Sequence, residues 1–145
     1  MRVLGVDYGD RRIGLALSDS TGMLARPWKT IPRTGNAVQV AAVLAREAEA
    51  LMQEEDGLGA IVVGLPRKLN GEPTHQTATV EAIVERLQSG VGIPVLLQDE
   101  RLTSREAESA LALTERDWRK RKAKLDAASA AVILQDYLDA RAPDE

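Results

Sequence analysis

The chain has 145 residues, no cysteine, one histidine and a formal net charge of −3. A length of this order suits one domain with its own core, so we expect residues 1–145 to form a single domain. The composition excludes disulfides, thiolate-bound zinc or iron–sulfur clusters and multi-histidine metal sites, which leaves carboxylate-bound Mg²⁺ or Mn²⁺ as the metals to expect.

The apolar run at the start of the chain is broken by Asp7 after only a few residues. This run is too short for the core of a signal peptide, and no later segment reaches the ~18 uncharged apolar residues of a membrane span. We therefore expect a cytoplasmic protein that does not interact with membranes.

The first part of the chain shows the pattern of three short strands. The predicted strands are apolar runs at residues 2–8, 13–18 and 24–31. Turn signals at Gly9-Asp10 and at residues 19–22 separate them. Short turns join antiparallel neighbours, so we predict a meander in which Pro27 marks the third strand as an edge strand.

From residue 36 onward, helices and strands alternate. The predicted helices are residues 36–55, 77–88, 103–113 and 125–140, the third of them opened by a capping box. Continuous apolar runs at 60–65 and 93–97 predict two strands that are buried on both faces. This order predicts an α/β protein of the ribonuclease-H-like architecture, with a five-stranded mixed sheet in the order 3-2-1-4-5 and helices on both faces.

Asp7 is the first candidate for a catalytic and metal-binding residue. It lies inside an otherwise apolar strand, where a charge is costly unless it is paired or bound to a metal. Gly5, Gly9 and Gly14 surround it in the sequence and leave room for a ligand or another backbone. The structural alternative is an Asp at the strand end that caps the turn at Gly9.

Two further acids are candidates. Glu100 follows the strand predicted at 93–97, and ligands of open α/β sheets bind outside the carboxyl ends of parallel strands. A solvated loop charge is its alternative role. Asp126 begins the apolar stripe of the last predicted helix, and the small residues 127–131 after it allow that helix to lie close to the sheet. Its alternative role is to stabilise the N-terminus of this helix.

Together, Asp7, Glu100 and Asp126 could hold the two metal ions with which nucleases hydrolyse a phosphodiester in line. Basic residues that could bind the nucleic acid are Arg11, Arg12, Arg67, Lys68, Arg101, Arg116, Arg119, Lys120, Arg121, Lys122 and Lys124. Such contacts would offset the acidic site and give salt-dependent, sequence-neutral binding. A solvated basic face is the alternative, and Arg101 could instead pair with a neighbouring acid.

The sequence does not decide the role of Trp118 and gives His75 no catalytic role. Trp118 lies in the basic stretch 116–124 and could stack on an unpaired base or anchor the core. His75 has no identifiable partner, and we read it as a residue at the entry of a helix rather than as a general base.

Four segments of the sequence together resemble the YqgF/RuvX family. They are VDYGDRRIGLALSD, VVGLPRKLNG, DERLT and KLDAASAAVILQDYL, in the order of the family and spread over nearly the whole chain. The resemblance implies a ribonuclease-H-like fold related to the resolvase RuvC, a divalent metal requirement, and catalytic acids at Asp7, Glu100 and Asp126. It implies a Holliday junction resolvase or, alternatively, a nuclease that matures precursor 16S ribosomal RNA.

Other functions stay open at this point. Sugar kinases and actin-like ATPases also begin with a glycine-flanked Asp on a strand, but they use two such domains, and the chain has no G-x-x-x-x-G-K-[ST] loop. A non-catalytic nucleic-acid-binding module is a further alternative. A junction resolvase makes two symmetric cuts and should therefore be a homodimer, whereas an RNA-processing nuclease could be a monomer.

Overall fold

The structure is a computed structural model that describes residues 1–68, 70–99 and 118–141. Its elements are β1 (Arg2–Tyr8), β2 (Arg12–Ser18), β3 (Ala25–Pro32), α1 (Ala37–Met52), β4 (Leu58–Leu65), α2 (Thr77–Gly90), β5 (Val95–Asp99) and α4 (Trp118–Arg141). The helix predicted at 103–113 lies outside the described residues. Across the ranges that are described, no helix is both long and apolar enough to cross a membrane.

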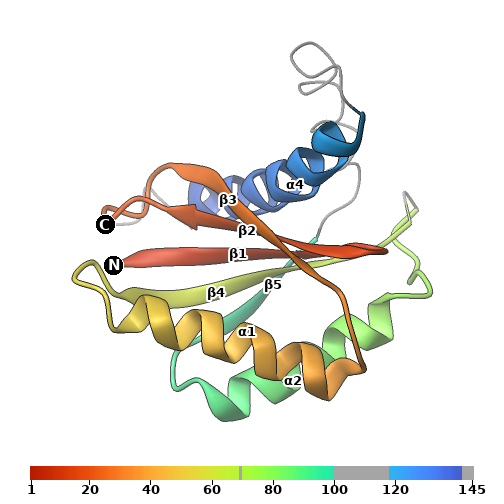
Figure 1. The fold of residues 1–145 in the computed structure, drawn as a ribbon, viewed down its shortest axis with the longest axis horizontal. Helices are drawn as coiled ribbons and strands as arrows, with labels where there is room; N and C mark the ends of the chain where they lie inside the picture. Colours follow the sequence, from red (N-terminus) through yellow and green to blue (C-terminus); the bar gives the residue numbers. More distant parts are fainter. Residues whose placement is uncertain (69, 100–117, 142–145) are drawn as a thin grey trace.

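The strands form one five-stranded sheet in the order β3-β2-β1-β4-β5, which confirms the predicted topology (Figure 1). β2 pairs antiparallel with both β1 and β3, as the two short turns require. β4 pairs parallel with both β1 and β5, so the carboxyl ends of these three strands lie at the same edge of the sheet. β3 is an edge strand, as Pro27 indicated, and its pairing with β2 is interrupted by a register shift between Leu15 and Ala16.

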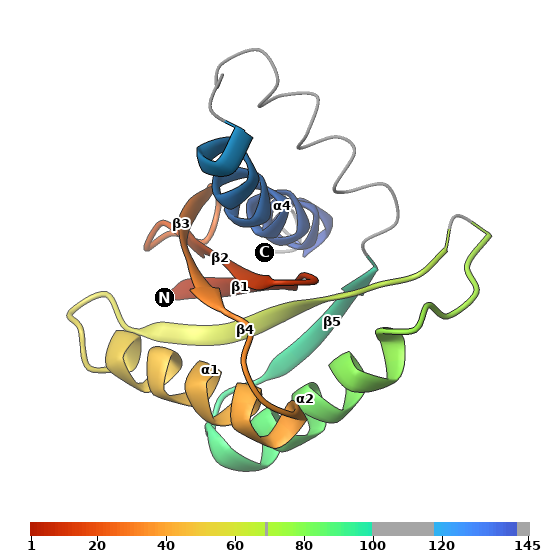
Figure 2. The ribbon, with the colours of Figure 1, turned by 45° about the vertical axis from the view of Figure 1, so that its right-hand side comes forward.

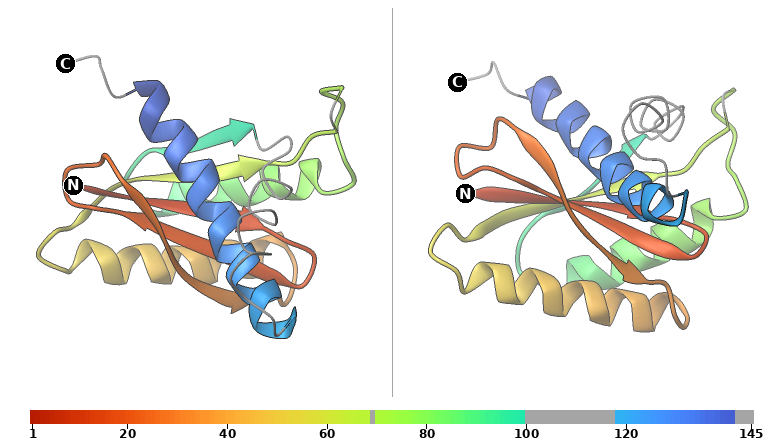
Figure 3. Two further views of the ribbon diagram at one scale, coloured as in Figure 1. Left: turned by 90° about the horizontal axis from the view of Figure 1, so that it is seen from above. Right: turned by 45° about the horizontal axis from the view of Figure 1, so that its top comes forward.

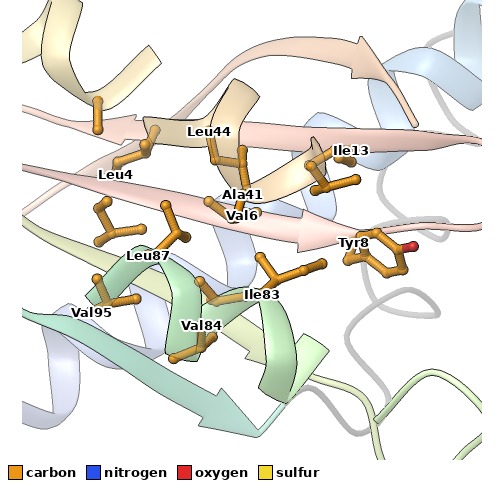
Figure 4. Packing of buried hydrophobic residues seen from close by; sticks show 14 of the residues in the cluster. Leu4, Val6, Tyr8, Ile13, Ala41, Leu44, Ile83, Val84, Leu87 and Val95 are labelled. Atoms are coloured by element: carbon orange, nitrogen blue, oxygen red, sulfur yellow. The ribbon is translucent and has the colours of Figure 1, made fainter. Parts of the chain in front are cut away.

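Helices cover both faces of the sheet, as predicted. α1 and α2 lie on one face and α4 lies on the other (Figures 1 and 2). The face toward α1 and α2 carries large aliphatic side chains from alternate strand positions, which pack against the two helices (Figure 4). The strand residues of this cluster include Leu4, Val6, Ile13, Leu15, Ile61, Val63 and Val95.

The face toward α4 carries much smaller side chains. Its cluster includes Ala16 and Ala60, and the glycines Gly5 and Gly14 lie on the same face. A Cβ added to Gly5 would lie 2.8 Å from the Cβ of Leu134, so the helix approaches the sheet more closely than a larger residue would allow. α4 crosses the strands obliquely on this face (Figure 3).

Two predictions about the elements were wrong. β5 is not buried on both faces, because Leu96 and Leu97 are 36% and 42% exposed. The reason is that β5 is an edge strand, as the predicted strand order required, and a continuous apolar run does not by itself mean burial on both faces. The last helix begins at Trp118 rather than at residue 125, because Arg, Lys and Ala are good helix formers and extend it beyond its apolar stripe.

Candidate active site

Asp7 lies one residue before the end of β1 and is only 7% exposed. Side chains alternate along a strand, and Val6 and Tyr8 belong to the cluster under α1 and α2. Asp7 therefore projects from the opposite face, the one covered by α4. It is a buried carboxylate near the carboxyl end of a central strand, and it lies within the first strand, as predicted.

Asp126 is brought to Asp7 by the packing of α4 on β2. Gly14 is the β2 residue that pairs with Asp7. A Cβ added to Gly14 would overlap the backbone carbonyl of Asp126. The backbone of α4 at Asp126 thus rests on the sheet position next to Asp7, and the two carboxylates come from neighbouring places although they are far apart in the sequence.

The position of Asp126 within α4 also bears on its role. Because α4 begins at Trp118, Asp126 lies in the body of the helix rather than in its first turn. The favourable interaction of an acid with the helix dipole is confined to the first turn. The alternative role of Asp126, stabilising the N-terminus of this helix, therefore does not hold.

The turn between β1 and β2 lies directly beside the carboxylate of Asp126. The amide of Gly9 donates to the carbonyl of Arg12 at 3.0 Å, which closes the turn. A Cβ added to Gly9 would lie 3.7 Å from Oδ1 of Asp126. On the other side, Nη1 of Arg12 lies 3.6 Å from Oδ2 of Asp126, whose side chain is 19% exposed. The Asp126 carboxylate is thus held between the Gly9 turn and the Arg12 guanidinium.

Neighbouring residues fix this turn from outside. Nη1 of Arg33 donates to the carbonyl of Gly9 at 2.8 Å, and its guanidinium lies 4.7 Å from the centre of the Tyr8 ring. Nε2 of Gln76, just before α2, donates to Oδ1 of Asp10 at 2.8 Å. Arg33 and Gln76 could not be identified from the sequence, because their roles depend on which elements meet beside this turn and no local pattern indicates that.

The predicted nucleic-acid-binding residues are only partly brought together. Arg11 is exposed on the β1–β2 turn, and Arg12 is the partner of Asp126. Lys68 is exposed in the segment after β4, whereas Arg67 is half-buried and donates to the carbonyl of Gly71 at 3.1 Å. Arg67 thus stabilises its own loop.

The remaining predicted contacts are not tested by the structure. Arg119, Lys120, Arg121, Lys122 and Lys124 belong to the first turns of α4, but their side chains are not described, nor is that of Trp118. Glu100, Arg101 and Arg116 lie outside the described residues. His75 is exposed just before α2, at the entry of a helix.

The chemistry of the donors suits a hard divalent cation. Asp7 and Asp126 offer carboxylate oxygens, which Mg²⁺ and Mn²⁺ prefer, and Gly9 and Gly14 keep side-chain atoms away from them. Among residues 1–68, 70–99 and 118–141 no group of three or more His, Cys, Asp or Glu could hold a metal ion. Glu100, the third predicted acid, comes directly after the last residue of β5.

Asp19 shows how a structural acid differs from this pair. Hydrogen bonds from the Thr21 hydroxyl and from the amides of Met23 and Leu24 lower its pKa to about 2. All of these donors lie within the same β2–β3 turn. A strongly lowered pKa here reflects a local turn, whereas Asp7 and Asp126 are defined by elements that converge from different parts of the chain.

Comparisons with known proteins show the family to which the chain belongs. The model of a protein family described as RuvX, Holliday junction resolvase, matches residues 1–140. A protein of Anaeromyxobacter dehalogenans is 41% identical over 145 residues, covering 99% of this chain and 100% of its own length. A protein of Syntrophus aciditrophicus is 39% identical over 142 residues, covering 97% and 89%. Both are named "Putative pre-16S rRNA nuclease".

Solved structures agree on the fold. RuvC of Thermus thermophilus in complex with a Holliday junction substrate superimposes with a TM-score of 0.54 at 16% identity, covering 99% of this chain and 96% of RuvC. The structure of Thermus thermophilus RuvC determined separately gives a TM-score of 0.53. The fold is therefore ribonuclease-H-like, as predicted.

Proposed function

The chain belongs to the RuvX family of nucleases, and on this premise we propose that it is a divalent-metal-dependent endonuclease that hydrolyses nucleic-acid phosphodiesters. Asp7, Asp126 and Glu100 are its proposed catalytic and metal-binding residues, with Mg²⁺ or Mn²⁺ as the metal. The substrate that we propose first is the Holliday junction named in the family description.

One observation carries the proposal. The backbone of Asp126 rests on Gly14, the residue that pairs with Asp7. Asp7 and Asp126 thus occupy neighbouring positions near the carboxyl end of a central strand, where ligands of α/β sheets bind. Like charges in a poorly solvated site repel each other, which a bound cation would relieve. A divalent cation would be stabilised by two neighbouring carboxylates, so the arrangement supports a metal-binding role.

In the proposed site, the acids would hold the metal and the basic residues would contact the substrate. Asp7 and Asp126 would hold the cation, and the packing of α4 on Gly14 keeps Asp126 in place before the substrate arrives. When bound, such an ion lowers the pKa of a water molecule and stabilises the leaving oxygen. The exposed side chains of Arg11 and Lys68 would contact phosphates beside the site. We propose the basic residues of 116–124 as further phosphate contacts.

A second candidate substrate has its own support. The relatives from Anaeromyxobacter dehalogenans and Syntrophus aciditrophicus are named for precursor 16S ribosomal RNA, and they align over nearly the whole chain. The same two-carboxylate site could cut either backbone, because hydrolysis in line needs the phosphodiester and not the sugar. We keep precursor ribosomal RNA as the alternative. A junction substrate would entail a homodimer, since two symmetric cuts require two sites.

The test is a cleavage assay with end-labelled substrates in Mn²⁺ or Mg²⁺. The panel contains a four-way DNA junction, its linear duplex, single strands and a precursor 16S ribosomal RNA fragment. Wild type is compared with Asp7→Asn and with Asp10→Asn, a matched control whose side chain is exposed and bonded to Gln76. We expect Asp7→Asn or a chelator to abolish cleavage and Asp10→Asn to retain it.

The outcomes separate the candidates. Paired symmetric nicks in the junction, with duplex intact, would support the resolvase and the dimer. Cleavage of RNA alone would make precursor ribosomal RNA the substrate. If Asp7→Asn still cuts like wild type, Asp7 is not catalytic, and if nothing is cut in any metal, a non-catalytic binding module becomes the better description.

A further inference from the structure

The contact between Arg12 and Asp126 has a consequence for metal binding. Arg12 opens β2, and its side chain lies on the α4 face, since it alternates with Ile13 of the opposite core. Its Nη1 lies 3.6 Å from Oδ2 of Asp126. The positively charged guanidinium of Arg12 therefore lies beside one of the carboxylates proposed to hold the metal.

The backbones on both sides of this ion pair are fixed. The carbonyl of Arg12 accepts the amide of Gly9 at 3.0 Å, and Arg12 pairs with Pro32 of β3. Asp126 is held by the packing of its own backbone on Gly14. The Arg12 side chain, by contrast, is 34% exposed and long enough to turn toward solvent. The guanidinium can leave the carboxylate without any movement of the sheet or the helix.

We propose that Arg12 is the counter-cation of Asp126 in the metal-free protein, and that it competes with the divalent ion for this carboxylate. This inference rests on the proposed function. Arg12 offsets the repulsion between Asp126 and the nearby Asp7 while no metal is bound, and it makes metal binding weaker than the carboxylates alone would give. Arg12 is thus a positioning residue that sets the affinity of the site for its metal.

The test measures Mn²⁺ binding to the full chain by calorimetry, without nucleic acid. Removing the competing charge in Arg12→Gln should tighten Mn²⁺ binding by roughly fivefold, the range expected for one partly exposed ion pair. Arg12→Lys keeps the charge and should bind Mn²⁺ nearly as wild type does. Arg11→Gln removes the adjacent, exposed charge and serves as the matched control, with little change expected.

A double-mutant cycle makes the assignment specific. In an Asp126→Asn background, Arg12→Gln should no longer tighten Mn²⁺ binding, because the carboxylate for which Arg12 competes is gone. Thermal melts of each variant show that the protein measured is folded.

Unchanged or weaker binding in Arg12→Gln would overturn the inference, and so would an equal gain in Arg11→Gln. Either result, obtained with a wild type that binds Mn²⁺, leaves the proposed function standing. Failure of wild type to bind Mn²⁺ at all would instead overturn the proposed function, and this inference with it.

Discussion

The two faces of the sheet are built from different residues. The face under α1 and α2 is filled mainly with leucine, isoleucine and valine, which form a continuous apolar core with Tyr8 (Figure 4). The face under α4 carries Gly5, Gly14, Ala16 and Ala60, together with the acid Asp7. Large side chains keep a helix at a distance, whereas small ones allow backbone contact.

This difference separates stability from the proposed chemistry. The apolar cluster on the first face is the larger of the two and supplies most of the hydrophobic stabilisation. On the second face, Gly5 and Gly14 have no side chains, so the backbone of α4 can pack against the sheet. This packing places Asp126 next to the strand partner of Asp7. Substitutions on the two faces should therefore have different signatures, the first affecting unfolding alone and the second affecting unfolding and metal binding together.

The largest change in stability is expected for Leu44→Ala. Leu44 lies on α1, is 1% exposed and packs into the aliphatic core (Figure 4). The lost burial and the cavity left behind should lower the free energy of unfolding by about 2–5 kcal/mol, measured by urea denaturation. The folded fraction should bind Mn²⁺ with unchanged affinity. A large loss of affinity in this variant would show that the two faces are not independent.

Gly14→Ala should lower the free energy of unfolding less than Leu44→Ala does. It should, however, impair Mn²⁺ binding and cleavage more. Its Cβ would overlap the carbonyl of Asp126, which is backbone and cannot rotate away, so α4 must shift. Overpacking of this kind costs about 1–3 kcal/mol. We expect weaker Mn²⁺ binding in calorimetry and loss of cleavage, because Asp126 moves with the helix. If metal binding survives intact, close contact at Gly14 is not what positions Asp126.

Sequence patterns predicted the frame of the molecule well. Short turns at Gly9 and at 19–22 specified an antiparallel meander, and the alternation of apolar runs with helical stripes specified the parallel crossovers. These features depend on neighbours within a few residues. For the same reason, the start of α4 was misplaced: its apolar stripe begins near residue 125, but helix propensity extends it back to Trp118.

The site was predicted only in part. Asp7 stood out because a charge in an apolar strand needs an explanation, and the small residues after Asp126 indicated close packing. Which sheet position would receive Asp126 could not be predicted, since this depends on the crossing of α4 over β2. Arg33 and the ion pair of Arg12 were missed for the same reason: both join segments that meet only in the folded chain.

A smaller loss of stability is expected for Asn36→Ala at the N-terminus of α1. Oδ1 of Asn36 accepts the amide of Gln39 at 3.0 Å, and Oε1 of Gln39 accepts the amide of Asn36 at 2.8 Å, forming a capping box. Removing this cap should lower the free energy of unfolding by about 1 kcal/mol in thermal or urea unfolding. Mn²⁺ affinity should stay the same, because the helix lies on the face away from Asp126.

The smallest change in stability is expected for Gly90→Ala, and it is an increase rather than a decrease. Gly90 is the last residue of α2, and an added Cβ would meet nothing within 4 Å. Alanine has the higher helix propensity, so the free energy of unfolding should rise by up to about 0.5–1 kcal/mol, while Mn²⁺ affinity stays unchanged. The same chemical change, Gly to Ala, thus destabilises at Gly14 and stabilises at Gly90. A loss of stability at Gly90 comparable to that at Gly14 would mean that the penalty at Gly14 does not come from its contact with Asp126. The opposite signs that we expect would assign that penalty to the packing of α4 on the sheet.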